Sequence, residues 1–312
     1  MISLLLEEIV EKKNLYIRHN SDYRTNSNQT LKNLQRFCGT MRGRLKTVGV
    51  ETVLIVVGVL LFIGPAWAGP PFFTDDPEPV EYLHWEIYVA SQWAHDKDAG
   101  TSGTLPHLEV NYGVVPDVQL HLIAPMAYSA PHDSSTQHGL GDIETGIKYR
   151  FIHEDEKGWR PQVGVFPLVD FPTGDSSRGL GAGHINLFLP LWVQKSWGPW
   201  TTYGGGGYDY HPGDDNKNYW FAGWLLQRDF SKMLTLGAEI FNSSPKEKGT
   251  SDETGFNFGG YLNLSEEYHI LFSAGRDIKG PNTFFAYFAF QWTFGPIGKE
   301  ELLEKQMEKP AH

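Results

Sequence analysis

After residue 82, polar and apolar residues alternate along the chain in segments of about ten residues, a period typical of β-strands and not of helices. Glycine, proline and acidic residues separate these segments. The pattern predicts an all-β protein with twelve strands, at 83–94, 105–113, 117–128, 141–152, 159–171, 183–196, 200–210, 218–228, 233–242, 254–264, 268–276 and 282–294.

The connections between these predicted strands alternate between short and long. Those after even-numbered strands are brief, such as VVP, WGP and SEE, whereas those after odd-numbered strands are longer or more polar, such as HDKDAGTSGT and NSSPKEKGTSDE. Outer-membrane barrels have short periplasmic turns and longer extracellular loops. The sequence therefore predicts one transmembrane, up-and-down antiparallel β-barrel over residues 83–294.

Each predicted strand has one aliphatic face and one mixed face. In 183–196, for example, Ile185, Leu187 and Leu189 alternate with His184 and Asn186. We expect the aliphatic faces to contact lipid and the mixed faces to line a narrow, amphipathic lumen, since twelve strands fall between small filled barrels and wide porins. The inward residues predicted to set selectivity are Glu86, Glu109, His121, Glu144, Lys148, Arg150, Arg160 and His184.

The charges among these inward residues are sorted along the chain. Glu86 and Glu109, with His121, precede the basic group of Lys148, Arg150 and Arg160. Arg150 is expected nearly opposite Arg160. Two like charges side by side are unfavourable unless an acid or a ligand neutralises them. One hypothesis is an acidic wall that faces a basic wall and selects solutes; the other is a salt-bridge network that only fills the barrel.

The last predicted strand reads FFAYFAFQWTFG. Its final outward aromatics, Phe290, Trp292 and Phe294, resemble the signal by which the barrel-assembly machinery receives outer-membrane proteins. Residues 295–312 are polar and are expected to form a periplasmic tail.

Residues 41–68 have the anatomy of a secretory signal peptide. A basic start is followed by the apolar run Val53–Ile63, which is shorter than the roughly 18–20 residues of a membrane helix, and then by Ala66-Trp67-Ala68. We expect cleavage after Ala68, with Ala66 and Ala68 as the small residues of the site. Residues 1–40 are then expected to precede the true translation start, and 69–82 to form a Pro- and Asp-rich periplasmic lead-in.

Composition narrows the chemistry further. The chain has 26 Lys and Arg against 37 Asp and Glu, a net charge of −11, which argues against nucleic-acid binding. Its one cysteine, Cys38, precedes the predicted cleavage site, so the exported part has no thiol. His107, Glu109 and His121 lack a four-ligand spacing, and no metal or other cofactor is predicted.

No catalytic signature is present either. Ser134, Ser135, Ser176 and Ser177 fall in predicted loops, and His132 and His138 lie near the first pair in the sequence, but no G-x-S-x-G or comparable motif accompanies them. The chain is therefore not expected to be an enzyme, and an outer-membrane enzyme remains the third alternative.

Several stretches together resemble an outer-membrane family labelled MetA-pathway of phenol degradation: GPPFFTDDPEPVEYLHWEIYVAS, GDIETGIKYRF, PQVGVFPLVDFPTGD, QKSWGPWTTYGGGGY and QWTFGP. The resemblance covers about residues 69–296. It implies a barrel in the outer membrane of a Gram-negative-type envelope that passes small, often aromatic or hydrophobic molecules. The alternative is a structural or export-assisting barrel with a plugged lumen. Its expected partners are outer-membrane lipid, the barrel-assembly machinery and a small-molecule solute.

Overall fold

The computed structural model describes residues 70–155 and 157–296. The predicted signal peptide, the first forty residues and the polar tail after residue 296 lie outside this range. The strands are β1 (Trp85–Asp96), β2 (Gly100–Val115), β3 (Val118–Pro131), β4 (Gln137–Leu140), β5 (Ile143–Ile152), β6 (Gln162–Val165), β7 (Leu168–Phe171), β8 (Asn186–Trp197), β9 (Trp200–Tyr210), β10 (Tyr219–Ser231), β11 (Leu234–Ser243), β12 (Glu253–Asn263), β13 (Tyr268–Lys279) and β14 (Phe284–Phe294).

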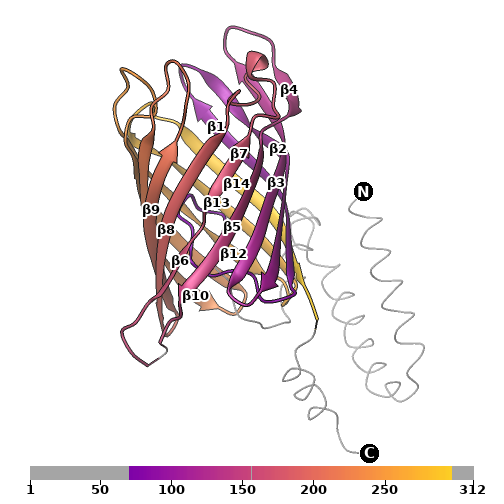
Figure 1. The fold of residues 1–312 in the computed structure, drawn as a ribbon, viewed down its shortest axis with the longest axis vertical. Helices are drawn as coiled ribbons and strands as arrows, with labels where there is room; N and C mark the ends of the chain where they lie inside the picture. The colour runs from indigo at the N-terminus through magenta and orange to yellow at the C-terminus, as the bar shows by residue number, and fades with distance from the viewer. Residues whose placement is uncertain (1–69, 156, 297–312) are drawn as a thin grey trace, which may run out of the picture. The chain divides into compact units, whose positions relative to one another are not determined.

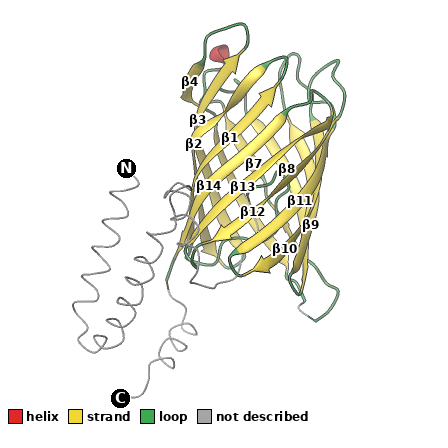
Figure 2. Cartoon of the chain, turned by 180° about the vertical axis from the view of Figure 1, so that it is seen from behind, coloured by secondary structure: helices red, strands yellow, loops and turns green. Residues whose placement is uncertain are grey.

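These segments form one closed antiparallel sheet (Figures 1 and 2). β4 and β5 both pair with β3, so they are one wall strand that is interrupted at residues 141–142. β6 and β7 both pair with β5 and with β8, and they form a second interrupted strand. The segments therefore make twelve wall strands, which confirms the predicted up-and-down barrel.

β14 closes the ring against β1. The register pairs Trp85 with Phe294 and His95 with Phe284, so the first and last strands are bonded along nearly their whole length. Closure removes the free sheet edges, whose unpaired backbone groups would be costly in lipid. The aromatic segment at the end of the sequence is thus the seam of the barrel.

The two faces of the strands separate as predicted. Val89, Ile147 and Phe290 are 51%, 52% and 41% exposed on the outside, whereas Tyr88, Lys148 and Gln291 beside them are almost fully buried within the lumen. Aromatic residues gather on the outside near the short turns, where Tyr268 stacks on Trp292 and Trp85 stacks on Tyr112. This matches the aromatic girdle of outer-membrane barrels.

The glycine run in β9 admits large rings on both sides of the wall. A Cβ on Gly204 would lie 2.4 Å from the Trp224 ring, and one on Gly205 would lie 2.0 Å from the Leu191 carbonyl and 3.1 Å from the Trp192 ring. Gly205 also has a φ of 151°, a conformation that glycine adopts more readily than other residues. The run is therefore needed for close packing of this wall.

The connections follow the predicted alternation in part: at the end expected to carry the longer loops, β1 and β2 are joined by residues 97–99 alone, and β13 and β14 by residues 280–283. Tight turns at 116–117, 198–199 and 232–233 lie at one end of the barrel, which we call the short-turn end, and the longer loops 172–185, 211–218 and 244–252 lie at the other, the long-loop end. The connection 153–161, at the short-turn end, is as long as the loop 244–252. Among the described residues, no helix is long and apolar enough to cross a membrane.

The long loop 172–185 is fixed by hydrogen bonds to Asp142, which lies between β4 and β5. The Asp142 carboxylate accepts hydrogen bonds from the amides of Gly174, at 2.9 Å, and Ala182, at 2.6 Å. Within the loop, a hydrogen bond from the Ser177 hydroxyl lowers the pKa of Asp175 below its ordinary value. The strand interruption at residues 141–142 thus places a carboxylate that holds this loop.

Candidate functional site

Residues 70–80 lie inside the barrel, and we call them the luminal segment (Figure 1). Thr74 and Asp76 are completely buried, and Val80 is 5% exposed. The sequence prediction of a periplasmic lead-in is therefore wrong for this stretch. The segment contains no strand or helix of its own, so its backbone groups must find partners on the barrel wall.

Side chains from opposite walls supply those partners. Glu239 on β11 accepts hydrogen bonds from the amides of Phe73, at 2.9 Å, and Thr74, at 2.8 Å. Gln119 on β3 accepts one from the amide of Val80 at 2.9 Å, and the Ser273 hydroxyl on β13 donates to the carbonyl of Pro71 at 2.6 Å. The segment is held along its length rather than at one point.

The basic residues predicted on β5 bind acids of the luminal segment. Lys148 Nζ lies 3.0 Å from Asp75 Oδ1 and 3.7 Å from Asp76 Oδ1. Arg150 lies 3.4 Å from Glu78 and 2.8 Å from Asp117, an acid in the turn before β3. Acids of the luminal segment therefore neutralise the charge of Lys148 and, together with Asp117, that of Arg150.

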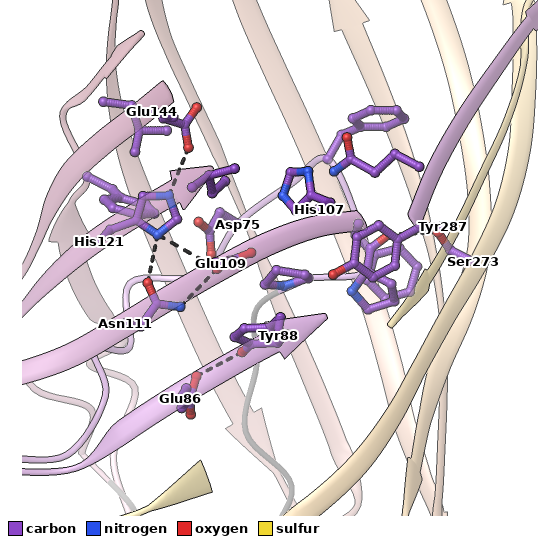
Figure 3. A pocket seen from close by; sticks show the side chains of 18 of the residues that line it. Asp75, Glu86, Tyr88, His107, Glu109, Asn111, His121, Glu144, Ser273 and Tyr287 are labelled. Carbon is purple, nitrogen blue, oxygen red and sulfur yellow. Dashed lines mark hydrogen bonds and ion pairs between the residues drawn. The ribbon is translucent and has the colours of Figure 1, made fainter. Parts of the chain in front are cut away.

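The acidic residues predicted on β1 and β2 belong to a neighbouring network (Figure 3). His121 on β3 contacts Asn111 Oδ1 at 2.7 Å and Glu144 Oε1 at 2.8 Å, and it lies 3.7 Å from Glu109. In the same region the Tyr88 hydroxyl donates to Glu86 at 2.8 Å. The structure thus brings together six of the eight predicted lumen residues: Glu86, Glu109, His121, Glu144, Lys148 and Arg150.

Arg160 is not in the lumen, which corrects the sequence prediction. It is exposed in the 153–161 connection, where its Nε donates to the carbonyl of His153 at 3.0 Å. β6 begins only at Gln162, and the register pairs Arg150 with Gly164. The predicted Arg150–Arg160 pair therefore does not form.

His184 lies before β8, at the long-loop end, and not among the other predicted lumen residues. It contacts Asn186 at 3.0 Å and Asn216 at 2.9 Å, and its ring lies 5.3 Å from that of His211. In the part of the chain that the structure describes, no group of three or more His, Cys, Asp or Glu is arranged to hold a metal ion.

Two of the cavities among the described residues bear on the lumen. The inner cavity, part of which is seen in Figure 3, has a volume of about 290 Å³. Its lining includes the largely apolar residues Phe72, Phe166, Leu168, Phe285 and Tyr287 and the polar residues His107, Glu109, His121, Glu144 and Lys148. The outer cavity, of about 460 Å³, lies toward the long loops among Phe188, Phe221, Phe241, Asp209, Lys246, Glu253 and Asp277. Phe73, Ala94 and Phe285 line both.

Sequence reasoning missed the luminal segment and Glu239, which anchors it. One signal was present: Lys148 and Arg150 were assigned inward without enough acids on adjacent strands, while Asp75, Asp76 and Glu78 lay in a short segment without an assigned partner. Matching these two sets would have suggested that the segment enters the lumen.

Comparison with known proteins gives a consistent result. A sequence model described as "Putative MetA-pathway of phenol degradation" matches residues 87–294. An outer membrane channel from Pseudomonas putida F1 superposes with a TM-score of 0.56 at 14% identity, covering 73% of this chain and 100% of that one. The NanC porin gives a TM-score of 0.49 at 8% identity, covering 66% and 98% of the two chains. The KdgM porin, solved with disordered oligogalacturonate, gives 0.47 at 8%, covering 67% and 99%. No curated protein matches.

Proposed function

The chain belongs to the family described as the MetA-pathway of phenol degradation, and from that premise we propose that it is a passive channel for small amphipathic molecules. Its closed barrel, of the outer-membrane type, carries an apolar belt and an aromatic girdle that fit the outer membrane of a Gram-negative-type envelope. In this proposal the luminal segment narrows the lumen without sealing it.

The inner cavity is the observation that carries this proposal. Its volume, about 290 Å³, is close to the lower end of the range for small-molecule sites, which is about 300–1,000 Å³. Aromatic rings and hydrogen-bonding groups both line it, and they are in contact: the Phe166 ring lies 5.2 Å from the His121 ring and 4.9 Å from Lys148 Nζ. Such a lining suits solutes that have an apolar body and a polar group, and aromatic solutes are the class we favour.

A specific observation favours the second candidate, a structural or export-assisting barrel with a plugged lumen. The luminal segment is bonded to β3, β5, β11 and β13, so it touches walls on several sides. A segment held in this way could close the lumen completely. The two candidates therefore differ in whether solute passes while the segment is in place.

An outer-membrane enzyme has less support. Ser177 donates its hydroxyl to Asp175, and His132 contacts the carbonyl of Lys97, so these two side chains are engaged in separate loop contacts. Neither contact orients a base toward a nucleophile.

Conductance in planar lipid bilayers tests the channel proposal. The intact protein should give discrete single-channel openings, and a variant that lacks residues 70–80 should give larger ones. The plugged-barrel alternative predicts no openings for the intact protein and large openings for the deletion variant. If neither the intact protein nor the deletion variant gives openings, although heat-modifiable gel mobility shows that each is inserted, the channel proposal is contradicted.

A further inference from the structure

Phe73 of the luminal segment occupies the boundary between the two cavities. Its ring centroid lies 4.9 Å from that of Phe241 on β11 and 5.2 Å from that of Phe285 on β14, both in edge-to-face geometry. Phe241 and Phe285 themselves are 5.8 Å apart. The three rings form a cluster that we call the aromatic gate, and beyond it Phe221 stacks on Phe241 at 6.2 Å.

The backbone at Phe73 is fixed, whereas its ring is not enclosed. The amides of Phe73 and Thr74 both donate to Glu239, which is 3% exposed. Phe73 as a whole is 49% exposed, because its side chain faces cavity on two sides. A side chain with this freedom changes rotamer in picoseconds to nanoseconds, whereas release of the segment requires several hydrogen bonds and ion pairs to break.

We propose that Phe73 is an exchangeable ring, and that a small aromatic solute passes the aromatic gate by replacing it against Phe241 and Phe285. This inference rests on the proposed channel function. When the Phe73 ring swings aside, the edge-to-face positions that it leaves fit another aromatic ring. A solute with no ring gains no such contact while it passes. The gate therefore selects for aromatic groups without movement of the luminal segment.

The size of the expected preference for aromatic solutes follows from the strength of contacts between aromatic rings. An aromatic pair is worth about 0.5–1.5 kcal/mol beyond its buried area, which corresponds to a preference of roughly two- to tenfold. The expected selectivity is therefore modest, as suits a passive channel.

Two membrane-impermeant neutral solutes measure the preference: phenyl β-glucoside, which carries a ring, and methyl β-glucoside, which does not. Vesicles containing the intact protein should take up the phenyl compound faster, by roughly two- to tenfold after correction for size. Phe73→Ala should raise the methyl glucoside rate and reduce the preference. Phe288→Ala is the matched control, because Phe288 lies on the outer, lipid-facing side of β14, where it is 50% exposed, and lines neither cavity.

A cross-link separates ring exchange from release of the segment. A Cβ built on Gly223 would lie 3.1 Å from the Cβ of Thr74, slightly less than the roughly 3.5–4.5 Å that a disulfide spans, so a small outward shift of the segment lets the bond form. The double variant Thr74→Cys/Gly223→Cys, when oxidised, should therefore hold the segment beside Phe73. Our proposal predicts that phenyl glucoside uptake survives oxidation.

The outcomes are distinguishable. If oxidation stops uptake and reductant restores it, the segment itself must move and the exchangeable-ring proposal is wrong. If both glucosides enter the intact protein at equal rates and Phe73→Ala changes neither rate, the aromatic gate is not selective and only this inference fails. If neither glucoside enters vesicles of the intact protein or of Phe73→Ala, the channel function fails as well.

Discussion

Lys148 on β5 and Asp75 of the luminal segment form an ion pair of 3.0 Å inside the barrel, although they are 73 residues apart in the sequence. The Lys148 side chain is 5% exposed, and Asp76 adds a second carboxylate at 3.7 Å. This pair joins the barrel wall to the segment that narrows its lumen. A change in this ion pair should therefore alter both the charge of the lumen and its width.

Replacing Lys148 with Gln should change both properties. Asp75 and Asp76 would lose their cation, and an unpaired buried charge costs about 3–5 kcal/mol, so the segment should loosen. We expect larger conductance and a reversal potential shifted toward cations in a salt gradient. Arg160→Gln removes a positive charge from the exposed 153–161 connection and should leave selectivity unchanged. Equal effects of the two variants would contradict a role for the Lys148 ion pair.

The Glu239 carboxylate should be needed to anchor the segment. Glu239→Ala leaves the amides of Phe73 and Thr74 without an acceptor, at a cost of about 1–3 kcal/mol each if they stay buried. Glu239→Gln keeps one carbonyl oxygen and should have an intermediate effect. The measurement is the rate of labelling of Thr74→Cys by a small thiol reagent in detergent. Labelling that is equally slow in all three backgrounds would show that other contacts suffice.

The lipid-facing belt gives a prediction about stability. Ile147, in the middle of β5, is 52% exposed on the outer face. Ile147→Lys should lower the free energy of unfolding by about 2–4 kcal/mol, because it places a charge in the hydrocarbon. Trp159→Lys, in the 153–161 connection, should have a much smaller effect. Urea unfolding in lipid vesicles compares the two, and similar midpoints would contradict the placement of the belt.

The end of the closing strand is proposed to act in assembly. Phe294 pairs with Trp85 at the short-turn end of the barrel, whereas Phe284 pairs with His95 at the other end. Phe294→Asp should reduce the amount of folded protein in outer-membrane fractions, and Phe284→Asp should reduce it less. Normal levels of the Phe294 variant would rule out its role as an assembly signal.

Much of the barrel was predictable because its determinants are local. Alternation of Leu120 and Leu122 with Gln119 and His121 defines a lipid face and a lumen face without reference to the rest of the chain. Register was less predictable. Arg160 lies in the 153–161 connection and not on a strand, so the register pairs Arg150 with Gly164 and leaves Arg160 outside the lumen.

The luminal segment could not be placed from local patterns. It has no hydrophobic period, and its contacts with Gln119, Lys148 and Glu239 are between 39 and 166 residues away in the sequence. Those contacts exist only once the barrel has closed around the segment. For the same reason, the aromatic gate at Phe73 could not be inferred from the strand pattern.

Uptake of phenyl β-glucoside by lipid vesicles tests the central claim most directly, namely that the lumen admits small amphipathic solutes while residues 70–80 are in place. Vesicles with the intact protein should take it up faster than protein-free vesicles, and deletion of residues 70–80 should raise the rate further. If the intact protein admits no more than protein-free vesicles, and only the deletion variant is permeable, the luminal segment is a plug and the account is contradicted.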